Sequence, residues 1–513
     1  MNENTEITLF VSENGDDRND GSREKPLWSI AAALGKIGGK SYKKAEIVIT
    51  GTITEPAARK AMVDICGKGL PPVFLRGESP EQPGILNAEG LNRQVLHISD
   101  GNSLCLGDNI VIRGGSVNGN GGAGVCIQGG TLIMEGGEIS DNDTGVGMGG
   151  GVYVGKDSEF IMRGGAITRN NSKMFGGGVF ADEGGVFTMR DGCIAGNRAA
   201  ISGGAVYVGE DAEFALHDGT IEENQAGGQG DVKIGGIRIS SGKGGGVYVD
   251  DGAAFTMYDG LIRKNRAMAA QGEAQNGGSG AGVYVAEGGR FTCLLGDIAE
   301  NSASNWGGGV YTEGAFTADS LAMISYNEAG LGGGGIQIAG KAGAFTMKGG
   351  YVAHNSTCGC GGAVNALIDS VFSMEDGAIA KNTADVMGNA LAIFGKACIS
   401  GGAVFDNNYI PPQDRQAKPD ETISDILKRI REIIDPELRE ANPAINMGTR
   451  REHPAILLVD TGKLSISGGI LEGAVAMTKP GQMEDTRPIP SHSVPERGKD
   501  GIRDPGNLRI QER

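Results

Sequence analysis

Two rows of side chains recur along the chain at nearly equal intervals, and both have the chemistry to bind a ligand. Regularly spaced aromatic rings suit the apolar faces of sugar rings when they are exposed. Stacked carboxylates repel one another unless water or a bound Ca²⁺ screens them. The aromatic row consists of Tyr153, Phe180, Tyr207, Tyr248, Tyr284 and Tyr311. The acidic row, a few residues further on in each unit, consists of Asp182, Glu183, Glu210, Asp211, Asp250, Asp251, Glu287 and Glu313.

The aromatic row predicts a ligand-binding site at Tyr207, Tyr248 and Tyr284. Lys233 and Arg238 belong to the same predicted site, because a long loop carries them toward these tyrosines. The alternative interpretation of the row is an ordinary packing stack.

The acidic row predicts weak Ca²⁺ binding at Asp250, Asp251 and Glu287. Carboxylate oxygens are the ligands that Ca²⁺ prefers. The alternative is a solvated acidic face that keeps strand edges from aggregating. No other cofactor is predicted.

Catalysis has little support in the sequence. Enzymes that cleave polysaccharides need clustered carboxylates, or Asp with Arg or Lys, at one cleft, and no odd polar residue interrupts the repeated Val-Tyr-Val runs. The histidines at 97, 217, 354, 453 and 492 share neither a register nor a partner. Among the eight cysteines only Cys358 and Cys360 lie close together, and zinc needs four ligands. We therefore predict no catalytic residue and eight uncrosslinked thiols.

These rows belong to a repeat of about 27 residues. Within each unit a Val-Tyr-Val run comes first, a Phe-Thr-Met run follows, and an Ile/Val-x-x-Asn segment ends the unit. Glycine, 91 of 513 residues, marks the turns between them. The first apolar residues of the units are Val125, Val152, Val179, Val206, Val247, Val283, Val310, Ile336, Val364 and Leu391. The recurring asparagines are Asn120, Asn142, Asn170, Asn197, Asn224, Asn265, Asn301, Asn327, Asn355, Asn382 and Asn407.

The alternation within each run has the period of a strand, and no part of the repeat has the period of a helix. Three short strands per unit predict an all-β fold, a right-handed parallel β-helix in which each unit is one coil and like residues stack. Val152, Phe160, Met162 and Ile167 are expected to point inward. The asparagines are expected to bond along the stack at a turn.

Long insertions all leave from one corner of the predicted coil. The ladder asparagine is usually followed after 9 residues by the next Val, but Asn224 is followed after 23 and Asn265 after 18. Lys233, Arg238 and Lys243 lie on the first of these loops. Such a face is often the binding face of a solenoid. The alternative is that these loops have no function, because lengthening a surface loop costs little entropy.

The ends of the chain depart from the repeat. A strand, a loop, a short helix and a second strand predict a cap over the N-terminal end of the core. After Asn407 an amphipathic helix is predicted from Glu421 to Ile434, ended by Asp435-Pro436. It is expected to pack on the flank of the solenoid or to close its end, and the alternative is that it binds a partner. The predicted divisions are a cap at 1–50, a β-helix at 51–407 with regular coils from about 122, a helical insertion at 408–455, a final coil at 456–473 and a flexible tail at 474–513.

Composition excludes some partners. The net charge is −17 and Lys and Arg form no basic stripe, which argues against nucleic acid as a partner. No apolar run approaches the ~18 residues of a transmembrane helix. The first residues show no signal peptide.

Two groups of motifs carry a family resemblance. The segment Phe-Val-Ser-Glu-Asn-Gly-Asp-Asp near the N-terminus is similar to the opening of pectate-lyase-like parallel β-helix proteins. Gly204-Ala205-Val206 and Gly362-Ala363-Val364 match the GGA[ILV] signature of polymorphic outer-membrane-type bacterial surface proteins, and Ile194 to Asn197 resembles their FxxN signature with Ile for Phe. The chain shows neither the secretion signal nor the C-terminal membrane barrel of that family.

The resemblance implies a non-enzymatic bacterial surface or secreted scaffold, adhesin-like and able to bind a glycan. Its expected partner is an extended glycan or a host or cell-surface protein, and its expected location is extracellular or at the cell surface. The alternative is a polysaccharide lyase or glycoside hydrolase that acts in the loop-flanked groove near Tyr207, Tyr248 and Tyr284. The oligomeric state is left open.

Overall fold

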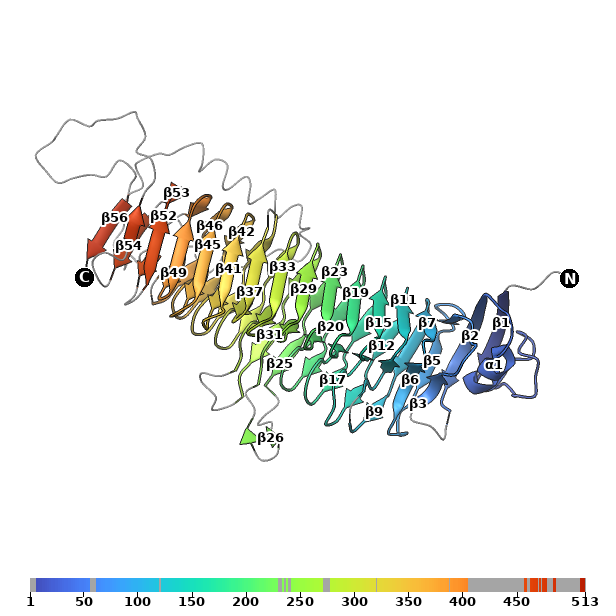
Figure 1. Ribbon diagram of the computed structural model, residues 1–513. Helices are drawn as coiled ribbons and strands as arrows, with labels where there is room; N and C mark the ends of the chain where they lie inside the picture. Colours follow the sequence, from blue (N-terminus) through green and yellow to red (C-terminus); the bar gives the residue numbers. More distant parts are fainter. Residues whose placement is uncertain are drawn as a thin grey trace, which may run out of the picture.

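The computed structural model is an elongated parallel β-solenoid of about 12 turns with a single helix in the part of the chain that it describes. Figure 1 shows the coils stacked into a rod, with β1 (Glu6–Ser12) and β56 (Leu508–Glu512) at opposite ends. The predicted all-β solenoid class is confirmed. The structure describes residues 6–55, 61–119, 121–228, 241–270, 277–319, 321–386 and 388–404, and the short segments 233–234, 237–238, 456–458, 462–468, 470–471, 473–477, 483–485 and 508–512.

Each coil contributes one strand to each of three parallel sheets. Sheet 1 holds the Val-Tyr-Val runs, sheet 2 the Phe-Thr-Met runs and sheet 3 the segments before the asparagines; β2 (Lys44–Ile53) enters both sheets 2 and 3. Sheet 1 consists of β3 (Ala61–Ile65), β6 (Gln94–Ser99), β10 (Val125–Gln128), β14 (Val152–Val154), β18 (Val179–Ala181), β22 (Val206–Val208), β28 (Val247–Val249), β32 (Val283–Val285), β36 (Val310–Thr312), β40 (Ile336–Ile338), β44 (Val364–Ala366), β48 (Leu391–Ile393), β51 (Ile456–Leu458), β54 (Gly473–Met477) and β56. Sheet 2 consists of β1, β2, β4 (Val73–Gly77), β7 (Ser103–Leu106), β11 (Thr131–Met134), β15 (Glu159–Met162), β19 (Val186–Met189), β23 (Glu213–Leu216), β29 (Ala254–Met257), β33 (Arg290–Cys293), β37 (Ala315–Ala318), β41 (Ala344–Met347), β45 (Val371–Met374), β49 (Lys396–Ile399), β52 (Lys463–Ile466) and β55 (Met483–Asp485). Sheet 3 consists of β2, β5 (Gly84–Asn87), β8 (Ile110–Arg113), β12 (Glu138–Ser140), β16 (Ala166–Thr168), β20 (Cys193–Ala195), β24 (Thr220–Glu222), β30 (Leu261–Arg263), β34 (Asp297–Ala299), β38 (Met323–Ser325), β42 (Tyr351–Ala353), β46 (Ala378–Ala380), β50 (Ala403–Val404) and β53 (Ile470–Leu471).

A fourth, narrow ladder follows the asparagines at the corner that leads back to sheet 1. Its strands are β9 (Ser116–Val117), β13 (Asp143–Thr144), β17 (Asn171–Ser172), β21 (Arg198–Ala199), β25 (Gln225–Gly227), β31 (Arg266–Met268), β35 (Ser302–Ala303), β39 (Glu328–Ala329), β43 (Ser356–Thr357) and β47 (Thr383–Ala384). The first long loop leaves from this corner and contains the antiparallel hairpin of β26 (Lys233–Ile234) and β27 (Ile237–Arg238).

The core lies inside the coil, as the alternation predicts. Val152, Phe160, Met162 and Ile167 point inward and are each 0% exposed. Like residues pair across coils in strict register, for example Phe160 with Phe187. The phenylalanine rings from 160 to 372 stack face to face with centroids 4.7–5.5 Å apart. Burial of such a continuous stack is the main stabilising term of the rod.

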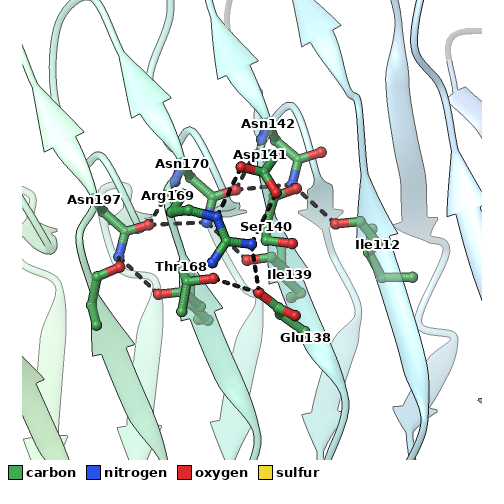
Figure 2. A network of polar contacts seen from close by, with 12 residues as sticks. Ile112, Glu138, Ile139, Ser140, Asp141, Asn142, Thr168, Arg169, Asn170 and Asn197 are labelled. Carbon is green, nitrogen blue, oxygen red and sulfur yellow. Dashed lines mark hydrogen bonds and ion pairs between the residues drawn. The ribbon is translucent and has the colours of Figure 1, made fainter. Parts of the chain in front are cut away.

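A buried asparagine ladder closes one turn of every regular coil (Figure 2). Asn170 Nδ2 donates to Asn197 Oδ1 at 3.0 Å and to the carbonyl of Ile139 at 2.9 Å, and its own Oδ1 accepts from Asn142 Nδ2 at 2.9 Å. The residue before each ladder asparagine has a left-handed backbone conformation; Arg169, for example, has a φ of 54°. All of these residues except one glycine carry a side chain, for which this conformation is unfavourable. The side-chain amides therefore hold a turn whose backbone costs energy.

The ladder runs from Asn142 to Asn382 in the described residues. Its first predicted member, Asn120, lies outside the described residues. The position opposite Asn142 in the preceding coil is held by Gly115, which donates its N–H to the Asn142 side chain. Asn407 lies outside the described residues.

The N-terminal end carries the strand, helix and strand that the sequence predicts. Helix α1 (Ile30–Ile37) buries Ile30, Ala33 and Ile37, and Ser29 caps it. Near the other end, the predicted insertion at 408–455 with its helix lies outside the described residues. Strands β51, β52 and β53 form the resumed coil. Strands β54, β55 and β56 continue the parallel sheets into the range predicted as a flexible tail, because short apolar runs such as Ala474–Met477 still suit a strand.

Candidate ligand-binding strip

The aromatic row lies on the outer side of sheet 1. The residues that flank each aromatic residue, valines in most units, are buried in the core, so the ring between them points outward. The rings of Tyr207 and Tyr248 stack at 4.7 Å, those of Tyr248 and Tyr284 at 5.1 Å, and those of Tyr284 and Tyr311 at 4.7 Å. The sequence therefore placed this row on the correct face.

A second layer of residues covers most of the row. Tyr207 is 8% exposed and Tyr284 2%. Phe175, from the corner before sheet 1, packs against Tyr207 with centroids 4.9 Å apart, and Lys243 Nζ lies 4.9 Å from the centroid of the Tyr284 ring. Met148 also packs against this row. The corner positions that Met148, Phe175 and Lys243 occupy are bridged from coil to coil in register, through Met148, Phe175, Ser202, Lys243, Ser279, Trp306, Gly332 and Cys360.

The row is consequently a small outer core, which is the packing-stack interpretation. Tyr248 keeps partial exposure, whereas Tyr207 and Tyr284 offer no open ring face for a ligand. The sequence signal for the cover was the bulky residue directly before Gly-Gly in some units, as at Phe175 and Trp306.

The aromatic and acidic rows form one hydrogen-bonded strip. Tyr207 donates its hydroxyl to Asp250 Oδ2 at 2.5 Å, and Tyr284 donates to Glu313 Oε2 at 2.7 Å. Tyr153 donates in the same way to Asp182. Burial, with the neighbouring carboxylates, raises the pKa of Tyr207 and of Tyr284 far above the usual range. The phenols therefore remain protonated donors that bind each coil to the next.

The predicted Ca²⁺ ligands lie along this strip. Asp250 accepts the Tyr207 hydroxyl through one oxygen and the N–H of Asp251 through the other, at 3.0 Å. Asp251 and Glu287 are exposed. Within the described residues no three His, Cys, Asp or Glu side chains gather around a common point. Weak Ca²⁺ binding stays a prediction for calorimetry to test.

Lys233 and Arg238 face each other across the β26–β27 hairpin, where their Cα atoms are register partners. Figure 1 shows β26 standing off the rod, beyond the edge that β25 and β31 form. The second long loop leaves from the next coil, after β31. Both loops leave the corner between coils of sheet 1 that carry Tyr207, Tyr248 and Tyr284, and a shared site of Lys233 and Arg238 with these tyrosines stays a prediction.

The expectation that no histidine has a partner is wrong for His97. Its Nδ1 lies 3.1 Å from Asp64 Oδ1 and its Nε2 lies 3.3 Å from Gln128 Oε1. These residues meet because β3, β6 and β10 stack in register, although they belong to early coils in which the repeat is irregular. Cys126 follows His97 in the same outward row but is 1% exposed, so its thiol is closed to solvent.

All eight cysteines lie in the described part of the chain, and none forms a disulfide. Burial raises the pKa of Cys193 to about 11 and that of Cys105 to about 12, which makes both thiols poor nucleophiles at neutral pH.

Comparison with protein-family models, with curated proteins and with solved structures finds no match for this chain. No helix among the described residues is long and apolar enough to cross a membrane.

Proposed function

We propose that the protein is a non-enzymatic binding scaffold, an adhesin-like bacterial surface or secreted protein of the polymorphic outer-membrane type. Its ligand in this proposal is an extended glycan or a protein of a host or cell surface. The rod supplies a rigid support, and the corner insertions supply the contacts.

The observation that carries the proposal is the hairpin of β26 and β27. It lengthens a connection that is short in the regular coils, it contains Lys233 and Arg238 as register partners, and Figure 1 shows β26 standing off the rod. Binding residues often lie on loops that a rigid scaffold positions. Tyr248, the least covered of the three central rings, and Lys243 lie on the coil that this hairpin joins.

The buried parts of the strip have a supporting role in this proposal. The Tyr207 and Tyr284 hydroxyls bind the coils that carry the insertions, so the loops keep a fixed spacing along the rod. Preorganised loops lose less conformational entropy when they bind.

Screening the purified chain on a glycan array, followed by mass spectrometry of each bound oligosaccharide after prolonged incubation, tests the proposal. We expect retention of one class of extended glycan with its mass unchanged. Shortened or unsaturated products would instead establish a polysaccharide-degrading enzyme. Absence of binding to glycans and to a panel of cell-surface proteins would refute the scaffold proposal.

A further inference from the structure

Four tyrosines in successive coils form an unbroken stack of rings on the outer side of sheet 1. We call Tyr207, Tyr248, Tyr284 and Tyr311 the tyrosine stack. Neighbouring ring centroids in this stack lie 4.7, 5.1 and 4.7 Å apart, and the rings are inclined to one another by 12°, 8° and 10°. Rings at this distance and angle are in van der Waals contact. An electron can therefore pass from one phenol ring to the next directly.

The inner phenylalanine stack has the same geometry and a different chemistry. Its rings are spaced alike, for example with 4.7 Å between the centroids of Phe214 and Phe255. A phenylalanine ring has no hydroxyl proton to lose, and it gives up an electron far less readily than a phenol does. Packing of rings along the rod therefore needs no hydroxyl group, and only the outer stack is built from side chains that undergo one-electron oxidation.

Both buried members of the tyrosine stack have a carboxylate placed to take the phenol proton. The Tyr207 hydroxyl donates to Asp250 Oδ2 at 2.5 Å, and the Tyr284 hydroxyl donates to Glu313 Oε2 at 2.7 Å. The other oxygen of Glu313 lies 3.5 Å from the Tyr311 hydroxyl. A phenol that loses an electron becomes a strong acid, and a carboxylate already bonded to its hydroxyl accepts the proton in the same step.

Lys243 makes loss of that proton a requirement at Tyr284. The Lys243 ammonium lies 4.9 Å from the centroid of the Tyr284 ring, and this tyrosine is 2% exposed. An oxidised ring that kept its proton would be a cation facing the ammonium group where little water screens the two charges, which is unfavourable. A neutral phenoxyl radical, with its proton on Glu313, places no positive charge on the ring.

The tyrosine stack is open to solvent at two of its members. Tyr248 and Tyr311 are partly exposed, whereas Tyr207 is 8% and Tyr284 2% exposed. An oxidant in solution can therefore contact the rings of Tyr248 and Tyr311 but not the ring of Tyr284. Since these two exposed rings flank Tyr284, an electron that leaves Tyr284 has a path of one ring in either direction.

We propose that the tyrosine stack relays single-electron oxidation along the rod, from the partly exposed phenols to the buried ones and back. This activity is independent of the binding of a ligand by the corner insertions. The oxidant is a one-electron acceptor from solution, such as a peroxyl radical, and the reductant that restores the stack is a soluble thiol.

Each step of the relay moves one electron and one proton. The peroxyl radical takes an electron from Tyr248, whose hydroxyl proton leaves to water, and with one proton from water the oxidant becomes a hydroperoxide. Tyr284 then gives an electron to the Tyr248 radical and its proton to Glu313, while Tyr248 regains a proton from water. These steps reverse when the radical returns to Tyr248. A soluble thiol there supplies one electron and one proton and is left as a thiyl radical.

Transient absorption of the full chain tests the relay. An aminotyrosine replaces Tyr284 as a radical trap, because its ring is more easily oxidised than that of tyrosine and its radical has a distinct spectrum. Photogenerated tris(bipyridyl)ruthenium(III) in solution is the oxidant. Tyr248→Phe with Tyr311→Phe removes both entry points and keeps the stacking, as Phe180 does in the same row. The matched control is Tyr258→Phe, at a tyrosine that is 42% exposed and lies outside the stack.

We expect the radical at position 284 to form at least tenfold more slowly when both entry tyrosines are phenylalanine, and at an unchanged rate in Tyr258→Phe. An unchanged rate in the double variant would show that the oxidant reaches position 284 without the flanking phenols, and it would overturn the proposal.

The proton acceptor is tested in the same assay. Glu313→Gln keeps the size of the side chain and an oxygen that accepts a hydrogen bond, but it does not take up a proton. We expect it to slow radical formation at position 284 at least tenfold. Glu210→Gln, at an exposed carboxylate on the turn after β22, should leave the rate unchanged. Equal rates in these two variants, with identical circular dichroism, would refute the coupled transfer of electron and proton.

Discussion

Removal of one ladder amide should weaken the solenoid far more than removal of the amide beside it. Asn170 is 0% exposed, and its side chain makes four hydrogen bonds: Nδ2 donates to Ile139 O and Asn197 Oδ1, and Oδ1 accepts from Asn142 N and Asn142 Nδ2. At about 1 kcal/mol for each bond, and with a buried N–H of Asn142 left unsatisfied, Asn170→Ala should cost about 3–5 kcal/mol.

Asn171→Ala is the matched control. Asn171 is partly exposed, and its Nδ2 donates to Asp143 Oδ2 at 3.1 Å on the solvent side. The same truncation one residue later should therefore cost under about 1 kcal/mol.

Native-state hydrogen exchange is the appropriate assay, because a long repeat array need not unfold in one step. We expect Asn170→Ala to speed exchange of the backbone amides from 138 to 172 by at least 100-fold, since ~1.4 kcal/mol corresponds to a factor of ten. Asn171→Ala should speed it by less than tenfold. Equal effects of the two variants would refute the view that the buried amides hold the left-handed turn.

Three further outcomes follow, two from buried polar groups and one from the exposed acidic row. Asp297 holds its proton in the folded chain to pH about 8, whereas an unfolded aspartate loses it near pH 4, so this group lowers the free energy of unfolding as pH rises through that interval. Asp297→Asn should therefore raise the free energy of unfolding by about 1–4 kcal/mol at pH 7.5 and by little at pH 4.5. An equal gain at both pH values in urea titrations would contradict this prediction. Tyr207→Phe should cost about 1–2 kcal/mol in the same titrations, because it removes a buried bond to the Asp250 carboxylate, and an unchanged urea midpoint would exclude that contribution. Calorimetry with millimolar Ca²⁺ should give weak binding heat that Asp251→Asn with Glu287→Gln abolishes; no heat in the parent chain would remove the predicted calcium site.

The repeat predicts the fold because every coil presents the same alternation to the same core. Val152 and Phe160 could be placed inward from the sequence since their neighbours one coil away are again Val and Phe. The asparagine ladder follows from its constant offset in the regular coils. Its first member was misassigned because Val117 to Asn120 matches the Ile/Val-x-x-Asn motif, whereas the spacing of the regular coils, 9 or 10 residues before the next Val, leads from Val125 back to the position of Gly115.

Burial outside the coil was less accessible to sequence reasoning. The outward side of Tyr284 follows from alternation, but its cover depends on the path of the corner that brings Lys243 over the ring. The partnership of His97 with Asp64 needs the register of irregular early coils, which no period reveals. The burial of Asp297 was not predicted either, because the alternation places this residue on the outer side of sheet 3, where a carboxyl is expected to be solvated.

The central claim is that the corner insertions bind and the rod supports them. The most direct test is made on a variant in which residues 225–246 are replaced by a copy of residues 198–205, the short connection of the preceding coil. This replacement restores the regular spacing. Biolayer interferometry then measures the affinity of the variant for the ligand that binds most tightly on the array. A second variant reverses the charge of the hairpin, with Lys233→Glu and Arg238→Glu. Its control carries Lys348→Glu and Lys396→Glu, at two exposed lysines of which the first directly follows β41 and the second begins β49 of sheet 2. We predict that the loop replacement abolishes binding and that the hairpin reversal weakens it at least tenfold, while the sheet 2 control changes it less than twofold. Parental affinity in the loop-replaced chain, with its β-sheet circular dichroism intact, would contradict the claim.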